Sequence, residues 1–242
     1  MKAIDKVVKR LSKIPLKIKP EEVPVVSVIG EIFVRRDEFC RKNITDYLEN
    51  RGFAAKVAPI SEFLCYSNYV LNSNPPDIEQ TLKERIRVRL TSKLQDWWER
   101  RIKTALAKCG LYKFEMVEVE KTLEASKHLI DIRLRGEAVL TVGLALREIL
   151  HDSCGVISIG PFGCMPSRVS EAILKKEMNV AGKARLPGWE KKAHEYADIG
   201  DFPFLAVETD GSPFPQLIEA NLEAFALQAG RLHEFHHFRK NR

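Results

Sequence analysis

Cys164 lies in the loop whose residue types are best suited to chemistry. The loop is GPFGCMPS, residues 160–167, which follows the apolar run VISI and precedes a helical pattern that begins after Pro166. A thiol at the start of a helix can act as a nucleophile, because the helix N-terminus lowers thiol pKa values. It can also ligate a metal or an iron–sulfur cluster, or simply fill space in a tight loop. The residues alone leave these three roles open.

The same loop has features of an anion site without matching a known phosphate loop. It lacks the GK[ST] ending of a P-loop, and the chain contains no GxGxxG pattern. Small residues such as Gly160 and Gly163 at the start of a helix still leave backbone amides for an anion. Ser167 is expected to cap the helix, and Arg168 adds positive charge. The loop therefore predicts an anionic ligand, such as a phosphate-bearing thioester or a nucleotide.

Two other groups of residues have chemically useful side chains. Glu208 and Asp210 follow the last apolar run, where paired carboxylates can perform acid–base chemistry or bind a metal. The Asp-Gly-Ser-Pro sequence around Asp210 also favours a plain turn. His233, His236 and His237 have metal-ligand spacing, but their place near the end of the chain favours a solvated terminal helix or a frayed tail.

Four apolar runs, each followed by a helical pattern, must position these residues. The predicted strands lie within residues 23–34, 53–60, 156–159 and 202–211. This alternation predicts right-handed crossovers and a doubly wound, mostly parallel sheet. Ligands bind such sheets beyond the carboxyl ends of the strands. Gly30, Glu31 and the loops 161–168 and 208–213 are therefore expected to meet at one edge.

The helical patterns give more specific expectations. One helix is predicted over residues 36–52, with Phe39, Ile44, Tyr47 and Leu48 on a shared face. Ser61 is expected to cap the next helix. Asn74-Pro75-Pro76 breaks the chain before a long charged helix, from 77 to about 108, and a further helix is predicted within 136–155. The pair Trp97 and Trp98 on the long helix favours a packing patch over a stacking platform for bases.

Composition and charge describe an ordinary globular chain. It has 242 residues, 45% of them hydrophobic, and a formal net charge of +6, which suits an acidic ligand or partner. The five cysteines are far apart and form no CxxC pair, so reduced thiols in the cytoplasm are expected. No run is long enough for a membrane span. We expect a basic lead-in over 1–22, an α/β domain over 23–232 with a helical insertion at about 77–135, and a His-rich basic tail over 233–242.

Several of these motifs together resemble the 2-hydroxyacyl-CoA dehydratase superfamily, above all its activase-related proteins. They are VIGEIFVRRDEF, RGEAVLTVG, ISIGPFGCMPSRVSEAIL and VETDGSPFPQLIEANLEAFALQA, in this order. The resemblance implies a flavodoxin-like domain that takes part in low-potential electron transfer to a CoA thioester or a similar substrate. It also implies an iron–sulfur cluster, of the 4Fe-4S type, with Cys164 in the position of one ligand.

The resemblance covers only the second, C-terminal half of such proteins. The upstream domain with the other ligand cysteines has no counterpart, so the remaining ligands are expected from a protein partner, a second copy, or local thiols. Cys65 is the best local second ligand, whereas Cys154 precedes its strand and is expected at the opposite edge. No ATP-binding segment is recognised. The alternative is a non-catalytic subunit that binds its partner through the Trp97–Trp98 helix; nucleic-acid binding by that basic helix is a weaker idea.

Overall fold

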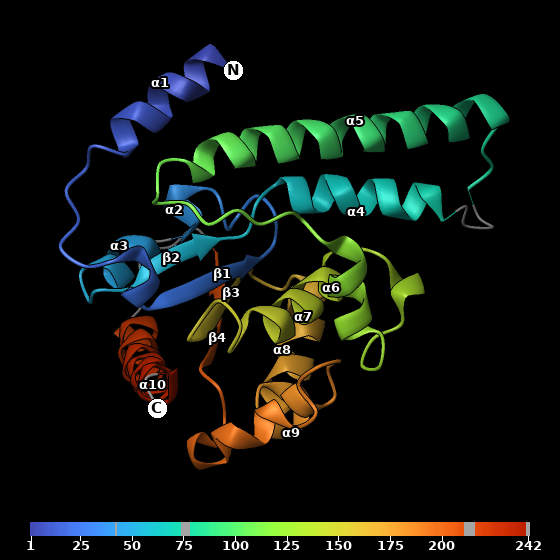
Figure 1. The fold of residues 1–242 in the computed structure, drawn as a ribbon. Helices are drawn as coiled ribbons and strands as arrows, with labels where there is room; N and C mark the ends of the chain where they lie inside the picture. The colour runs from blue at the N-terminus through green and yellow to red at the C-terminus, as the bar shows by residue number, and fades with distance from the viewer. Residues whose placement is uncertain (42, 74–77, 211–215, 241–242) are drawn as a thin grey trace. The chain divides into compact units, whose positions relative to one another are not determined.

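The chain forms two compact units in the computed structural model, which describes residues 1–41, 43–73, 78–210 and 216–240 (Figure 1). The α/β unit comprises Pro24–Pro59 and Glu120–Arg242, and the helical unit comprises Met1–Val23 and Ile60–Val119. The helical unit thus contains residues 1–23 and 60–76 in addition to most of the insertion predicted at about 77–135.

A four-stranded, all-parallel sheet forms the centre of the α/β unit. Its strands are β1 (Val25–Gly30), β2 (Ala54–Val57), β3 (Gly155–Pro161) and β4 (Phe204–Thr209), in the order β2-β1-β3-β4. The predicted α/β class with a flavodoxin-like, parallel sheet of about four strands is therefore confirmed. The central strands β1 and β3 are buried almost throughout, because helices cover both faces of the sheet.

Alternate residues of the central strands divide the apolar core into two layers. The side chains of Val28 and Ile157 lie in one layer, with residues of α3 (Ile44–Glu49) and α10 (Gln216–Lys240). Ile29 and Val156 lie in the other, with residues of α7 (Glu137–Glu148), α8 (Met165–Glu177) and η3 (Lys192–Ile199). The remaining helices of this part of the chain are α2 (Glu38–Arg41), α6 (Val119–Ser126), η2 (Ile132–Leu134) and α9 (Val180–Ala184). Because successive side chains of a strand point to opposite faces of the sheet, the apolar residues of β1 and β3 bind helices on both faces.

Three of the predicted helices differ from the structure in their limits. The helix predicted over 36–52 is two short ones, α2 and α3, because Asn43 before α3 takes a left-handed conformation, with φ of 55°. Phe39 is exposed and does not share the buried face of Ile44 and Leu48. The helix predicted within 136–155 ends at Glu148, since Leu150 also has a positive φ, of 65°. The last helix continues to Lys240, so the tail predicted over 233–242 is helical as far as that residue, and His236 Nδ1 lies 2.5 Å from the hydroxyl of Tyr196.

The helical unit contains α1 (Lys2–Leu11), η1 (Pro20–Glu22), α4 (Ser61–Asn72) and α5 (Leu82–Ala107). Ser61 is the first residue of α4 and not its cap, which is Ile60. The long predicted helix begins at Leu82, where Thr81 and Glu84 form a reciprocal capping box. The predicted break at 74–76 and the predicted start at 77 lie outside the described residues. None of the described helices combines the length and the apolar character needed to cross a membrane.

Candidate functional site

The loop after β3 lies at the carboxyl edge of the sheet and is fixed by backbone hydrogen bonds. The N–H of Phe162 donates to the carbonyl of Thr209 at 2.9 Å, which ties the loop to the end of β4. The N–H of Cys164 donates to the carbonyl of Pro161 at 3.1 Å and closes a tight turn. Gly163 within this turn has φ of 71°, a conformation that favours glycine. The turn directs the chain from β3 straight into α8.

Cys164 is the N-cap residue of α8, and its side chain makes no capping hydrogen bond. Its carbonyl accepts the N–H of Arg168 at 3.0 Å. The prediction that Ser167 caps this helix is wrong, because Pro166 occupies the first turn and the helix starts earlier. Cys164 is half-buried, whereas its neighbours Phe162 and Met165 are largely exposed. The thiol therefore lies at the surface between two apolar side chains.

Gly160 is required because the first turn of α8 packs directly against the end of β3. A Cβ atom at position 160 would overlap the side chain of Ser167. Ser167 therefore contributes to the loop by close packing and not by capping. This contact fixes how far the helix, and with it Cys164, stands from the strand.

The contact between Gly160 and Ser167 can be tested with one substitution that overfills it and a second that relieves it. Gly160→Ala is expected to reduce the free energy of unfolding by about 1 to 3 kcal/mol, because overpacking displaces α8. Adding Ser167→Gly removes the obstructing side chain and is expected to restore most of this loss. Urea titrations and the rate of Cys164 alkylation measure both effects. Equal losses in the single and double variants would mean that the Gly160–Ser167 contact does not set the loop.

Glu208 and Arg168 form an ion pair across this loop. Arg168 Nη2 lies 2.8 Å from Glu208 Oε2, and Arg168 Nη1 lies 2.8 Å from Glu171 Oε2. The hydrogen bond to Glu171 raises the pKa of the Arg168 guanidinium. Glu208 Oε1 also accepts the N–H of Gly163 at 3.3 Å. Arg168 and Glu208, whose charges were expected to serve a ligand, therefore hold the loop in place. Asp210 is exposed just beyond β4, and the predicted turn that follows it, at 211–213, lies outside the described residues.

The end of β1 lies beside this loop in the sheet. Gly30 pairs with Ile159, and the N–H of Glu31 donates to the Ile159 carbonyl at 2.9 Å. The Glu31 carboxylate accepts the N–H groups of Phe33 and Val34, at 3.1 and 2.7 Å, and so closes the next turn. The register also pairs Gly160 of β3 with Glu208 of β4. The structure thus brings Gly30 and Glu31, the loop after β3 and the end of β4 at Glu208 to one edge.

Two polar residues of this edge were missed as site residues. Arg35 is buried, and its Nη1 donates to the Gly30 carbonyl at 3.0 Å. Glu137, the first residue of α7, accepts the N–H of Ile32 at 3.0 Å. Burial raises the pKa of the Glu137 carboxyl, against the lowering effect of this hydrogen bond. The contact between Ile32 and Glu137 has no local sequence signal, since the two residues are far apart in the chain.

Cys65 belongs to the other unit, within α4, where its environment opposes the thiolate. Burial raises the pKa of Cys65 to about 11, and the negative charges of Glu99 and Asp96 act in the same direction. A metal at Cys65 would therefore have to displace a firmly held proton. Cys154 precedes β3 at the opposite edge, where its thiol donates to the Val25 carbonyl at 3.2 Å and burial raises its pKa to about 12.

The α/β unit does not fit a complete iron–sulfur cluster by itself. Such clusters are usually held by four thiolates. Within the described residues of this unit, Cys164 belongs to no group of three His, Cys, Asp or Glu side chains close enough to share a metal. Within the described residues the unit therefore offers Cys164 as a half-buried thiol at its carboxyl edge, and a cluster there would need ligands from outside the unit.

Comparisons with protein-family models, with curated proteins and with solved structures gave no match.

Proposed function

We propose that this chain is one component of a dehydratase-like, activase-related iron–sulfur protein, in which Cys164 supplies one ligand to a cluster completed by a partner chain. The observation that carries the proposal is the placement of Cys164 at the N-cap of a 13-residue helix at the carboxyl edge of a parallel sheet. Ligand sites of doubly wound sheets lie at this edge. The motif resemblance supplies the class of cofactor.

The surroundings of Cys164 suit a thiolate that a partner covers. The first N–H groups of α8 have no acceptor within the helix, and those of Met165 and Ser167 follow Cys164 directly in the first turn. The exposed side chains of Phe162 and Met165 flank the thiol, and a docked partner would bury them and exclude water. Such a cluster would supply low-potential one-electron transfer to a CoA thioester or a similar substrate. A cytoplasmic, oxygen-poor setting that keeps thiols reduced belongs to the same proposal.

A second candidate function is that of a non-catalytic subunit whose role is to bind the cluster-bearing partner. The half-exposed pair Trp97 and Trp98 on α5 favours it, because large aromatic side chains at a surface are common anchors of protein interfaces. The two candidates differ in whether this chain itself contributes an iron ligand.

Anaerobic reconstitution with iron and sulfide tests the ligand role. An excess of 2-mercaptoethanol supplies the thiolates that a partner would otherwise provide. The wild-type chain is expected to bind iron and turn brown, and Cys164→Ala to retain at least about tenfold less iron. Iron and sulfide content after gel filtration, with the visible spectrum, is the measurement.

Two matched variants sharpen this experiment. Cys40→Ala removes another half-buried thiol of the same unit and is expected to bind iron as the wild type does. Cys65→Ala shows whether that thiol serves as a second local ligand, by a partial loss of iron. Equal iron in Cys164→Ala and wild type would overturn the ligand role and leave the partner-binding function.

A further inference from the structure

The exposed large apolar side chains of this protein are concentrated in the helical unit, and especially on α5. This helix carries seven of them over its 26 residues: Leu82, Ile86, Leu90, Leu94, Trp97, Trp98 and Ile102. Leu82 and Leu90 are 75% and 63% exposed, so they are not covered by another part of the chain. A row of this size on one helix is the mark of an interaction surface and not of scattered surface residues.

Helix α5 has two faces with different roles. Its partly buried residues include Val88, Ser92, Gln95 and Glu99, spaced three or four apart. This face is the one toward α4, since Asn72 Nδ2 donates to Ser92 Oγ at 3.0 Å and Asn68 donates to Gln95. The apolar residues lie on the opposite side, because one residue advances about 100° around an α-helix. We name the apolar row Leu82, Ile86, Leu90, Leu94 and Trp98 the α5 ridge; Trp97 lies beside it.

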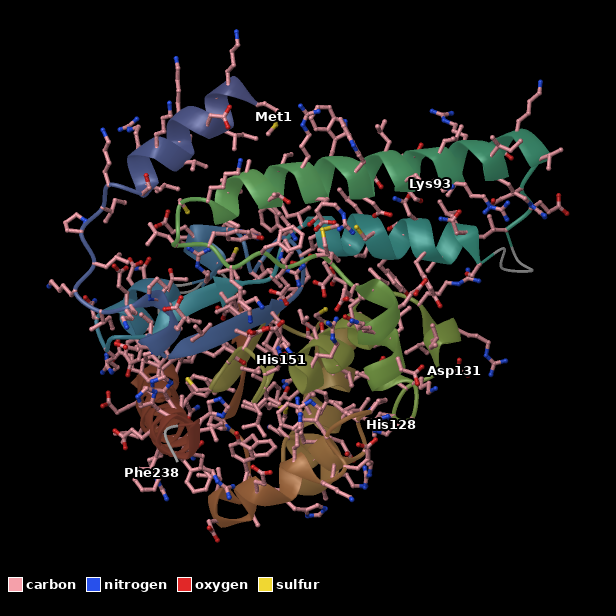
Figure 2. All side chains as sticks on the ribbon, in the orientation of Figure 1. Met1, Lys93, His128, Asp131, His151 and Phe238 are labelled. Carbon is pink, nitrogen blue, oxygen red and sulfur yellow. The ribbon has the colours of Figure 1, made fainter. Side chains whose placement is uncertain are left out.

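Among the charged residues of α5 itself, those on the side of the α5 ridge are all positive. Helical spacing places five exposed cations on the same half of the helix, namely Lys83, Arg87, Lys93, Arg100 and Arg101 (side chains in Figure 2, with Lys93 labelled). The three carboxylates of α5 lie elsewhere: Glu84 binds the cap residue Thr81, the charge of Asp96 acts on Cys65 of α4, and Glu99 pairs with Lys103 at 2.6 Å. The helical unit also holds the whole of the chain's net charge of +6, since acidic and basic residues balance in the α/β unit.

Trp97 and Trp98 are held in place before any partner binds. Their ring centroids are 4.8 Å apart, in an edge-to-face arrangement. The guanidinium carbon of Arg101 lies 5.0 Å from the Trp97 ring and 5.7 Å from that of Trp98. Aromatic side chains that are already ordered lose little entropy on binding and make good anchors.

We infer that the α5 ridge docks an acidic amphipathic helix of a partner protein. A second copy of this chain is a poor occupant, because pairing two α5 ridges would bring their cations together. A flat lipid surface is also a poor fit, because the α5 ridge is not straight. Residues four apart turn by about 40° around the helix per step, so the ridge winds through about 160° from Leu82 to Trp98 and cannot lie on one plane. A helix crossing at an angle follows such an inclined row, as in ridges-into-grooves packing. The inference rests on the proposed function only in its need for a partner chain, and it does not depend on the iron–sulfur cluster.

The test uses a synthetic acidic helix as the probe. The peptide has about 20 residues, a row of leucines at i, i+4 spacing flanked by glutamates, and no tryptophan. Two of the chain's three tryptophans are on α5, so their fluorescence reports contact directly. Saturable binding is expected, weakened at least about tenfold by Leu90→Ser and further by raised salt. Leu227→Ser, which changes a leucine of similar exposure (65%) on α10, is the matched control and is expected to bind as the wild type does.

Three results would overturn the inference. The first is equal binding of the acidic peptide and a scrambled peptide of the same composition. The second is a dimer of the full chain in sedimentation experiments that Leu90→Ser dissociates, which would assign the α5 ridge to a second copy. The third is a fluorescence shift with phosphatidylglycerol vesicles but not with the peptide, which would assign it to a membrane. Iron loading separates the two proposals: Leu90→Ser should load as the wild type does, and Cys164→Ala should bind the peptide normally.

Discussion

Replacing Lys183 with methionine is expected to lower the free energy of unfolding by about 3 to 5 kcal/mol. The Lys183 side chain is completely buried in the α/β unit. Its Nζ donates to the carbonyls of Leu146 and Ile149 at 2.6 Å each, and to that of Arg147 at 3.3 Å. These carbonyls belong to the end of α7, where no further helical turn satisfies them. Methionine fills similar space but removes the donor from the buried carbonyls of Leu146 and Ile149.

The size of the effect follows from the number of contacts that a single side chain makes. Nζ also lies 4.2 Å from the centroid of the Trp189 ring, so the variant loses a cation–π contact as well. Urea titration followed by circular dichroism measures the loss. Lys192→Met, which changes an exposed lysine of η3, is the control and is expected to stay within about 0.5 kcal/mol of wild type. A loss below about 1 kcal/mol in Lys183→Met would contradict the structural role given to Nζ.

The loss of stability in Lys183→Met is also expected to depend on pH. Burial lowers the pKa of Lys183 to about 7, whereas an unfolded lysine titrates near 10.4. Between these values the unfolded chain holds one more proton at this site than the folded chain does, so the free energy of unfolding rises with pH. The difference between wild type and Lys183→Met is therefore expected to grow from about pH 7 to about pH 10. A difference that is flat or falls over this range would contradict the lowered pKa.

The sheet could be predicted from the sequence because its strands are short apolar runs that alternate with helical patterns. Local patterns also placed Cys164 in a strand-end loop, since glycines and a proline delimit that loop. Lys183 shows where such reasoning stops. A lysine in a short helix normally predicts a solvated side chain, and only the three carbonyls brought to it by α7 explain its burial. Contacts between distant segments also explain why Arg35, whose Nη2 donates to the Pro59 carbonyl at 3.3 Å, and Glu137 were missed as site residues.

The helical unit was harder to predict because α5 has apolar residues on one side and a mixed row on the other. Periodicity shows that a helix has an apolar face, but not which face packs against the chain. The polar row of Ser92 and Gln95 faces α4, and the apolar ridge is exposed. Trp97 and Trp98, expected as a packing patch, contact each other and Arg101 and remain half-exposed. Ser167 was assigned wrongly as the cap because the helix begins earlier, after Cys164 and with Pro166 in its first turn.

Gly30→Ala is the second substitution with a large expected effect, a loss of about 3 to 5 kcal/mol in the free energy of unfolding. Gly30 ends β1 with φ of 108°, where a side chain is strained. A Cβ atom there would also come closer than 3.0 Å to backbone atoms of Ile159 in β3. Ile159 cannot move away freely, because it pairs with Gly30 in the sheet and its carbonyl accepts the N–H of Glu31. The clash therefore separates the two central strands at the edge where the candidate site lies.

A second glycine distinguishes the clash from the backbone strain. Gly52 also has a positive φ, of 83°, but a Cβ atom there would meet nothing within 4 Å. Gly52→Ala is expected to cost only about 1 to 2 kcal/mol, the strain of the left-handed conformation. Urea titrations of both variants give the comparison, and the alkylation rate of Cys164 reports whether the site edge moves. Only the substitution at Gly30 adds the contact with Ile159. Equal losses of unfolding free energy in the two variants would therefore show that β1 and β3 can separate at little cost. Gly30 would then not hold Glu31 and the Cys164 loop at a fixed spacing.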